Sequence, residues 1–279
     1  MQNKTDKQPE RTEAGRGAIK KLGSPKEIQR QNILTVLIWL YRWGFSTADI
    51  LSDLLKRSNR SHARRMEKNG WVRSVSIKGY PTYFVLTEKG LAEAIHHSTV
   101  LLDYKERDPY RVNLPKLHHD LLTQKETIMA MREGGYQDFI TLRMFDFDEE
   151  RRPLKIPDVI LVEKLKDEFG LPVDELTGVE VELTPKWDRD LDQFVTNIVD
   201  DILGRRLDKF IIITDSNAIQ ERYGNAFKPG NQIKRWSKTS GSKFVESEET
   251  LQIQNWIAGY VFFREVGSKK DNYPSHYLP

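Results

Sequence analysis

The sequence predicts an α/β (α+β) protein of two domains, and three observations lead to this prediction. The front of the chain has apolar residues at helical spacing, followed by the pattern of a β-hairpin. Further along, the helix and strand patterns follow the order α-β-β-β-α-β. Between the two, residues 103–115 are rich in charge and proline, which is typical of a linker. We therefore expect a disordered tail at 1–24, a small domain at 25–102, the linker at 103–115 and a larger domain at 116–279.

The elements of the front domain can be assigned in order. Helical spacing of apolar residues predicts a helix from Glu27 until Gly44 stops it, and "STADILSDLL" predicts a second helix with Ser46 or Thr47 as its N-cap. "NRSHARRMEKNGW" predicts a third helix ended by Asn69 and Gly70. The strands "WVRSVSI" and "TYFVLT" follow, and "TEKGLAEAIHH" begins a fourth helix. Three helices followed by a β-hairpin make a winged helix-turn-helix.

The elements of the larger domain come next. We expect a helix at 114–133, strands at 138–145, 155–163 and 178–186, a helix at 188–204 and a strand at 209–216. A charged excursion at 164–177 separates the second strand from the third. The last sixty residues predict a helix around 232–239, a strand at 250–254 or 259–265, and a loose tail rich in Tyr and Pro.

Composition limits the classes of function. The 279 residues are 38% hydrophobic and 30% charged, as in a globular protein with a charged surface. No apolar run reaches the ~18 residues of a membrane span, and the polar start of the chain is not a secretory signal, so we expect no membrane partner. The chain has no cysteine, which excludes disulfides and thiolate metal sites and fits a cytoplasmic location. Phosphate-loop and dinucleotide-binding motifs are absent.

The net charge of +3 conceals an asymmetry along the chain. Residues 1–80 contain 17 Lys and Arg against 7 Asp and Glu, so the remainder carries 27 basic against 34 acidic residues. A basic front can meet a polyanion, and clustered acids behind it can hold cations.

The third helix and the hairpin carry the basic excess. Arg60, Arg64 and Lys68 are four residues apart and share a helix face, while Ala63 and Met66 lie on the inward side. In a winged helix-turn-helix this helix enters the major groove of DNA. The predicted contacts to duplex DNA are Lys56, Arg57, Arg60, Arg64, Arg65, Lys68, Arg73, Lys78 and Tyr80. Alternatively, the winged helix is a protein-binding module and these charges form a solvated face.

Acidic residues mark the larger domain. In the strand "GVEVELTPK", Glu180 and Glu182 alternate with apolar residues and therefore share one face. Asp158 follows a proline at the centre of the preceding strand, so neighbouring strands would bring three carboxylates together. Such a cluster suits a divalent cation, Mg²⁺ or Mn²⁺, that polarises a phosphodiester and lowers the pKa of a bound water. The alternative is a solvated strand face.

These motifs resemble a known family. Pro157–Asp158, the "EVE" element and the α-β-β-β-α-β order look like the PD-(D/E)xK restriction-endonuclease-like superfamily. A winged helix joined to "LHHDLL", "IPDVILVE" and "GVEVELTP" resembles, more narrowly, the replication-relaxation proteins, which include MobC-type relaxases. The resemblance covers roughly residues 30 to 215. It implies a nickase acting at the transfer or replication origin of a plasmid or integrative mobile element, with relaxosome accessory and coupling proteins as partners.

The resemblance also implies roles for particular residues. Asp158 corresponds to the motif aspartate and Glu180 to the second acid, whereas Glu182 stands where most of these nucleases keep a lysine. Lys186, four residues further, could reach back to replace that lysine, or Glu182 could bind metal or act as the base. The leading helix of this fold often lends a metal ligand, here His119 and Glu126, which lie seven apart on one helix face.

Two other functions remain open. The chain could be a DNA-binding replication or transcription regulator with a degenerate nuclease fold, or the nuclease subunit of a transposition complex. A winged helix that reads a palindrome favours a homodimer. Relaxases with a tyrosine nucleophile and a His-x-His cluster are not supported, because the chain has His96–His97 and His118–His119 but no His-x-His.

Overall fold

The computed structural model describes residues 24–102, 112–145, 151–238 and 243–266. The predicted N-terminal tail (except Ser24), residues 103–111 of the predicted linker and the Tyr- and Pro-rich tail from 267 onward lie outside the described residues. The fold is mixed α/β, as the sequence predicts. Within the described part, no helix is long and apolar enough to cross a membrane.

From residue 24 to residue 102, the front part of the chain contains four helices around a small antiparallel sheet of order β1-β3-β2. Ser24 and Glu27 form a capping box that starts the first helix, and Gly44, with φ of 87°, ends it. The elements are α2 (Pro25–Trp43), β1 (Ser46–Thr47), α3 (Ala48–Leu54), α4 (Ser61–Lys68), β2 (Val72–Val75), β3 (Tyr83–Leu86) and α5 (Glu88–His97). All the helices and both strands predicted for this part are present within a few residues.

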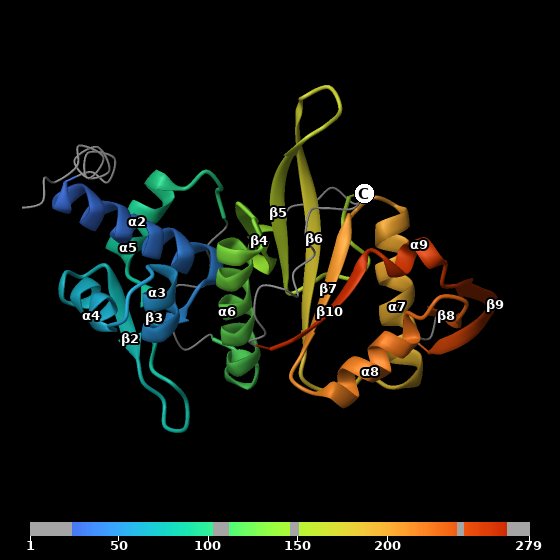
Figure 1. Ribbon diagram of the computed structural model, residues 1–279. Coiled ribbons are helices and arrows are strands. Elements are labelled where there is room, and N and C mark those ends of the chain that lie inside the picture. Colours follow the sequence, from blue (N-terminus) through green and yellow to red (C-terminus); the bar gives the residue numbers. More distant parts are fainter. Residues whose placement is uncertain (1–23, 103–111, 146–150, 239–242, 267–279) are drawn as a thin grey trace, which may run out of the picture.

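The rest of the chain contains a five-stranded sheet of order β10-β7-β6-β5-β4 (Figure 1). Strand β5 is antiparallel to both of its neighbours, β4 and β6, while β6, β7 and β10 run parallel. The elements are η2 (Leu114–Lys116), α6 (Leu117–Glu133), β4 (Asp138–Thr141), η3 (Leu142–Met144), β5 (Val159–Lys166), β6 (Pro172–Glu182), α7 (Asp188–Leu203), β7 (Lys209–Thr214), α8 (Asn217–Ala226), β8 (Gln232–Lys238), β9 (Phe244–Gln252), α9 (Asn255–Ala258) and β10 (Val261–Glu265). The predicted order α-β-β-β-α-β is found in α6, β4, β5, β6, α7 and β7.

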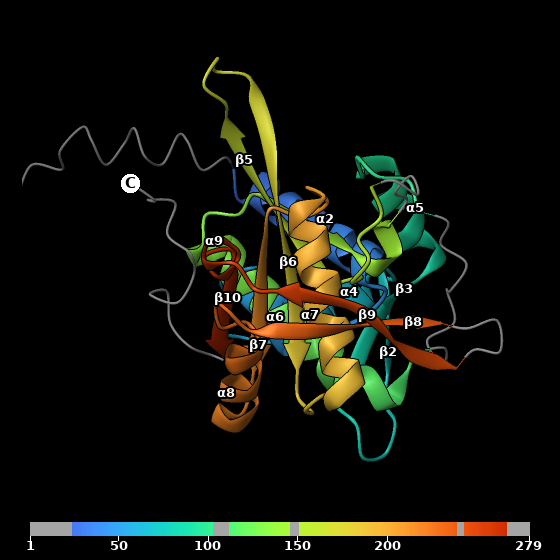
Figure 2. The ribbon, with the colours of Figure 1, turned by 90° about the vertical axis from the view of Figure 1, so that its right-hand side faces the viewer.

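Helices cover both faces of this sheet. Val179 and Val181 of β6 point to the face that α6 covers, and they join the core that also contains the front helices. On the opposite face, Phe194, Val195 and Ile198 of α7 pack against β7 and α8. Figure 2 shows α7 lying in front of the sheet, with the two-stranded ribbon of β8 and β9 crossing beside it. Alternation along β6 therefore turns Glu180 and Glu182 toward α7.

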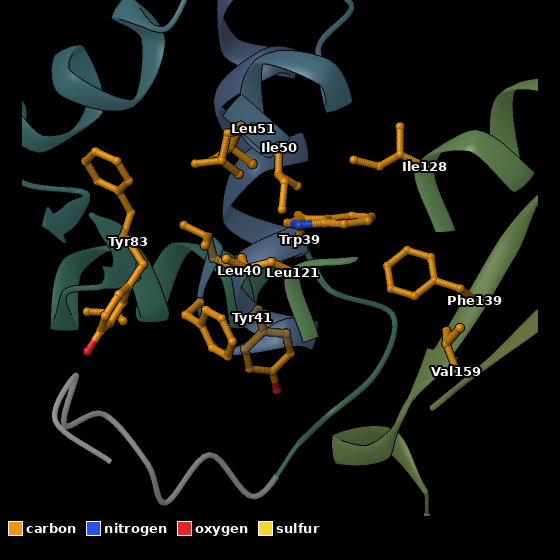
Figure 3. Packing of buried hydrophobic residues seen from close by; sticks show 14 of the residues in the cluster. Trp39, Leu40, Tyr41, Ile50, Leu51, Tyr83, Leu121, Ile128, Phe139 and Val159 are labelled. Atoms are coloured by element: carbon orange, nitrogen blue, oxygen red, sulfur yellow. The ribbon is translucent and has the colours of Figure 1, made fainter. Parts of the chain in front are cut away.

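The front part and the five-stranded sheet share one buried core. The ring of Trp39 in α2 lies 5.1 Å from the ring of Phe139 in β4, and Figure 3 shows Trp39 between Ile50 and Phe139. The buried side chain of Gln124 in α6 accepts hydrogen bonds from Trp39 Nε1 (3.1 Å) and Ser46 Oγ (2.7 Å), and donates one to the carbonyl of Phe45 (2.9 Å). The front part and the larger part of the chain thus pack against each other through buried side chains.

Three predicted elements are wrong. Residues 232–238 form strand β8, not a helix, because antiparallel pairing with β9 satisfies their backbone groups and places Lys234 beside Glu246. Most of the excursion at 164–177 belongs to a long β5–β6 hairpin, in which Lys164 is the register partner of Asp174. The strand predicted at 138–145 ends at Thr141, where a 3-10 turn replaces it.

Candidate functional site

Asp158 precedes β5 and does not lie at the centre of a strand, as the sequence had suggested. Its backbone N–H donates to the carbonyl of Val179 (2.9 Å), and its carboxylate accepts the N–H of Val181 (2.8 Å). These two hydrogen bonds attach Asp158 to β6 at the residues on either side of Glu180. A carboxylate that accepts a backbone N–H is held in a fixed orientation. The position of Asp158 relative to Glu180 is therefore fixed by the main chain.

Lys155 enters the site from the loop before Asp158, and sequence reasoning missed it. Its ammonium lies 2.6 Å from Glu180 Oε2 and also donates to the carbonyl of Ile156 (2.8 Å). The loop is held by Asp201 of α7, a fully buried carboxylate that accepts the N–H groups of Leu154 (2.7 Å) and Lys155 (2.9 Å). The available signal was the tetrapeptide "KIPD", which puts a lysine three residues before Asp158.

Lys186 reaches back over the end of β6. Its ammonium forms a close ion pair with Glu182 and lies 4.0 Å from Glu180 Oε1. Tyr223 of α8 fixes the turn, because its hydroxyl accepts the N–H of Lys186 (3.1 Å) and donates to Glu182 Oε2 (3.1 Å). The ammonium of Lys186 also lies 4.8 Å from the ring centre of Phe194. The lysine thus lies beside both glutamates, while the Glu182 carboxylate is already bound on two sides.

Burial and charge shift the ionisation of these groups. Burial raises the pKa of Glu180, the nearby charge of Asp158 raises it further, and Lys155 opposes the rise. Burial lowers the pKa of Lys186, although the charge of Glu180 opposes this. Shifted pKa values of this kind cluster at functional sites, so Glu180 and Lys186 mark a candidate site.

His119 of α6 meets Asp158 from the other face of the sheet. Its Nε2 lies 3.2 Å from Asp158 Oδ2 and 3.0 Å from the carbonyl of Val181, and its Nδ1 lies 3.3 Å from Asp120. Hydrogen bonds to Asp120 and to Asp158 raise the pKa of His119 to about 10. Because both ring nitrogens face oxygen acceptors, the imidazolium form is favoured. His119 is placed here as a hydrogen-bond donor to Asp158, which does not suit the expected role of a metal ligand.

The other residues expected at a metal site lie apart from one another. Glu126 forms an interior ion pair with Arg264 of β10 (2.8 Å), and both side chains are almost fully buried. Among the residues that the structure describes, no group of three or more His, Asp or Glu side chains is placed to hold a metal ion. The expected convergence of Asp158, Glu180 and Glu182 is therefore not found there. Of this set, Asp158 directly precedes β5 and Glu180 lies on the neighbouring strand β6.

The residues predicted to contact DNA lie on α4, on the β2–β3 hairpin and in the segment between α3 and α4. Ala63 and Met66 are buried as predicted, and His62 is buried beside them. Arg60 precedes the first turn of α4 and pairs with Asp49 of α3, both side chains being well exposed. Exposed side chains are found at Lys56, Arg60, Arg64, Arg65, Lys68, Arg73, Lys78 and Tyr80, and Arg57 is half-buried. The structure therefore places the whole predicted DNA-binding set at or near the surface.

Comparison with known proteins gives no match. No protein-family model matches the chain, and no curated protein and no solved structure is significantly similar to it. The resemblance to relaxases therefore rests on the sequence motifs alone.

Proposed function

We propose that this protein binds duplex DNA through α4 and the β2–β3 hairpin and nicks one strand at the site formed by Asp158, Glu180, Lys155 and Lys186. The resemblance of the motifs suggests an origin of transfer or replication of a mobile element as the target. In this reading the front part is a winged helix and the five-stranded sheet is the core of a PD-(D/E)xK-like nuclease.

The element order and the surface support the DNA-binding half of the proposal. Helices α3 and α4 precede a two-stranded hairpin, and β1 adds a third strand to it. The second helix of such a unit is the one that enters a major groove. Its exposed Arg64, Arg65 and Lys68 supply the density of positive charge that phosphate contacts require.

Sheet topology supports the nuclease half. Three antiparallel strands followed by a helix and a parallel strand form the arrangement implied by the resemblance. In it, Asp158 and Glu180 lie at the point where β5 begins beside β6. A Mg²⁺ or Mn²⁺ ion bound by these carboxylates would supply charge stabilisation at the phosphodiester and an activated water.

In this mechanism the residues around Asp158 and Glu180 have different roles. Asp158 is oriented by the N–H of Val181 and by His119, and Glu180 by the ammonium of Lys155. Lys186, with its lowered pKa, is suited to take a proton from the attacking water or to hold that water beside the phosphate. It occupies the role that the resemblance assigns to a lysine at position 182.

The observation that carries the proposal is that Asp158 is bound to β6 on both sides of Glu180 and that two lysines surround Glu180. Incubation of supercoiled plasmid with the protein and Mg²⁺ or Mn²⁺ should yield open circles. Asp158→Asn and Glu180→Gln should abolish nicking, whereas the exposed Asp174→Asn should nick like the parent. Nicking that survives Asp158→Asn would overturn the assignment of the site.

A DNA-binding regulator that does not cleave is the second candidate, and one observation favours it. Glu180 and Glu182 already have protein cations as partners, so the site is electrically satisfied without a metal. In that case the parent would bind duplex DNA, Arg64→Ala would weaken the binding, and neither Mg²⁺ nor Mn²⁺ would produce open circles from any plasmid.

A further inference from the structure

A groove separates the DNA-binding elements from α6. It has a volume of about 860 Å³ and runs between α3, α4 and the hairpin on one side and α6 on the other. Arg60 and Arg64 line it from the α4 side, Pro81 and Thr82 from the hairpin, and His118 and Lys125 from α6. None of the residues that sequence reasoning assigned to DNA binding comes from α6.

The groove wall on α6 is exposed and basic. His118 and Lys125 lie seven residues apart and therefore face the same way, with Leu122 between them. Lys125 is exposed. Across the groove, Arg64 is also exposed, and the acid of the lining, Asp49, is paired with Arg60. Two opposed basic walls above an apolar floor complement a linear polyanion.

The two consecutive histidines face different sites. His118 lines the groove, while His119 contacts Asp158 on the side of the helix turned toward the sheet. Successive helix residues point about 100° apart, so a single turn of α6 borders both regions. The buried hydrogen bonds of Gln124 join α6 to the front part beside this groove.

We infer that the groove holds the sugar–phosphate backbone of one strand of the duplex that α4 reads, and that Lys125 of α6 contacts its phosphates. This inference rests on the proposed DNA binding and adds the back part of the chain to the footprint. Its opposed basic side chains suit one phosphate backbone, and a duplex so placed would lie against α6, the helix that carries His119.

The first test measures binding of a fluorescently labelled duplex of arbitrary sequence at several salt concentrations. Lys125→Ala should weaken binding several-fold at low salt and reduce the slope of log K against log salt by about 0.9, the value for one lost phosphate contact. Lys228→Ala, an exposed lysine at the end of α8, is the matched control and should change neither quantity. Lys68→Ala, an exposed residue of α4 outside the groove, tests the proposed function separately.

The results of these binding measurements distinguish failure of the groove inference from failure of the proposed DNA binding. If Lys68→Ala weakens binding and Lys125→Ala leaves affinity and salt slope unchanged, the groove is not part of the footprint but DNA binding stands. If the parent binds no duplex at any salt concentration, the proposed function fails and this inference with it.

A second test locates the DNA directly. The chain has no cysteine, so Leu122→Cys provides a single attachment point for a photo-crosslinker on the groove floor while keeping every charge. Duplex DNA should crosslink there and not to the same reagent at Glu248→Cys on the distant ribbon of β8 and β9. Equal crosslinking at both positions, or crosslinking of single-stranded DNA or RNA in preference to duplex, would overturn the inference.

Discussion

The ammonium of Lys155 lies 2.6 Å from the carboxylate of Glu180, and Lys155 is only three residues from Asp158. The same short loop thus carries Asp158 and Lys155, the counterion of Glu180. Because Glu180 is almost completely buried, its charge is stabilised chiefly by this lysine, with Lys186 further away. Lys155 therefore determines whether Glu180 is a carboxylate available to a cation.

Replacing Lys155 by Met tests this dependence. The change leaves a buried carboxylate without its nearest cation and should lower the free energy of unfolding by about 3 kcal/mol at neutral pH. Urea denaturation measures the loss. The double variant Lys155→Met with Glu180→Leu removes both charges and should recover much of it, since an apolar pair is often as stable as a buried ion pair. Additive losses in the double variant would show that the two side chains do not interact.

Asp201 should matter for activity although it lies on α7, outside the site. Its carboxylate accepts the N–H groups of Leu154 and Lys155, so Asp201→Asn weakens two charge-assisted hydrogen bonds that position the loop. We expect a loss of stability of about 1–3 kcal/mol and slower nicking. The exposed Asp215→Asn, the matched control, should change neither. Unchanged nicking in Asp201→Asn at a temperature where it is fully folded would remove the loop from the mechanism.

Much of this arrangement could be predicted from the sequence, and the failures have physical causes. Periodicity identified β6 and α7, because each buries an apolar face. The face shared by Glu180 and Glu182 followed from strand alternation. By contrast, the pairing of Glu126 with Arg264 joins residues far apart in the chain and has no local pattern. Strand β8 was missed since its apolar residues are few and its partner β9 decides its conformation.

His119 should make stability depend on pH in the metal-free protein. Its pKa is raised from 6.5 to about 10 by Asp120 and Asp158, so the charged form stabilises the fold. This contribution is complete below about pH 6.5, declines as the pH rises, and is lost above about pH 10. Denaturation in EDTA should therefore show the parent losing more stability than His119→Gln between these limits. Parallel pH profiles for the two proteins would contradict the hydrogen bonds assigned to His119.

Glu182 stands where the resembled nucleases keep a lysine, and its carboxylate is engaged by Lys186 and Tyr223. If the cation is bound by Asp158 and Glu180 alone, Glu182→Gln should retain the stabilisation that Mg²⁺ gives. That stabilisation amounts to about 2.7 kcal/mol when the ion is present at 100 times its dissociation constant. Glu180→Gln should lose it. Thermal unfolding of the parent and both variants, with and without Mg²⁺, measures the difference.

The variants Glu182→Gln and Glu180→Gln also show whether Glu182 is a metal ligand or a residue that positions Lys186. Glu182→Gln frees the ammonium of Lys186, whose lowered pKa should fall further once its closest carboxylate is gone. Nicking by Glu182→Gln should therefore persist and its rise with pH should shift to lower pH, since the neutral amine forms earlier. Loss of both Mg²⁺ stabilisation and nicking in Glu182→Gln would instead make Glu182 a third ligand, and Lys186 its counterion in the metal-free state.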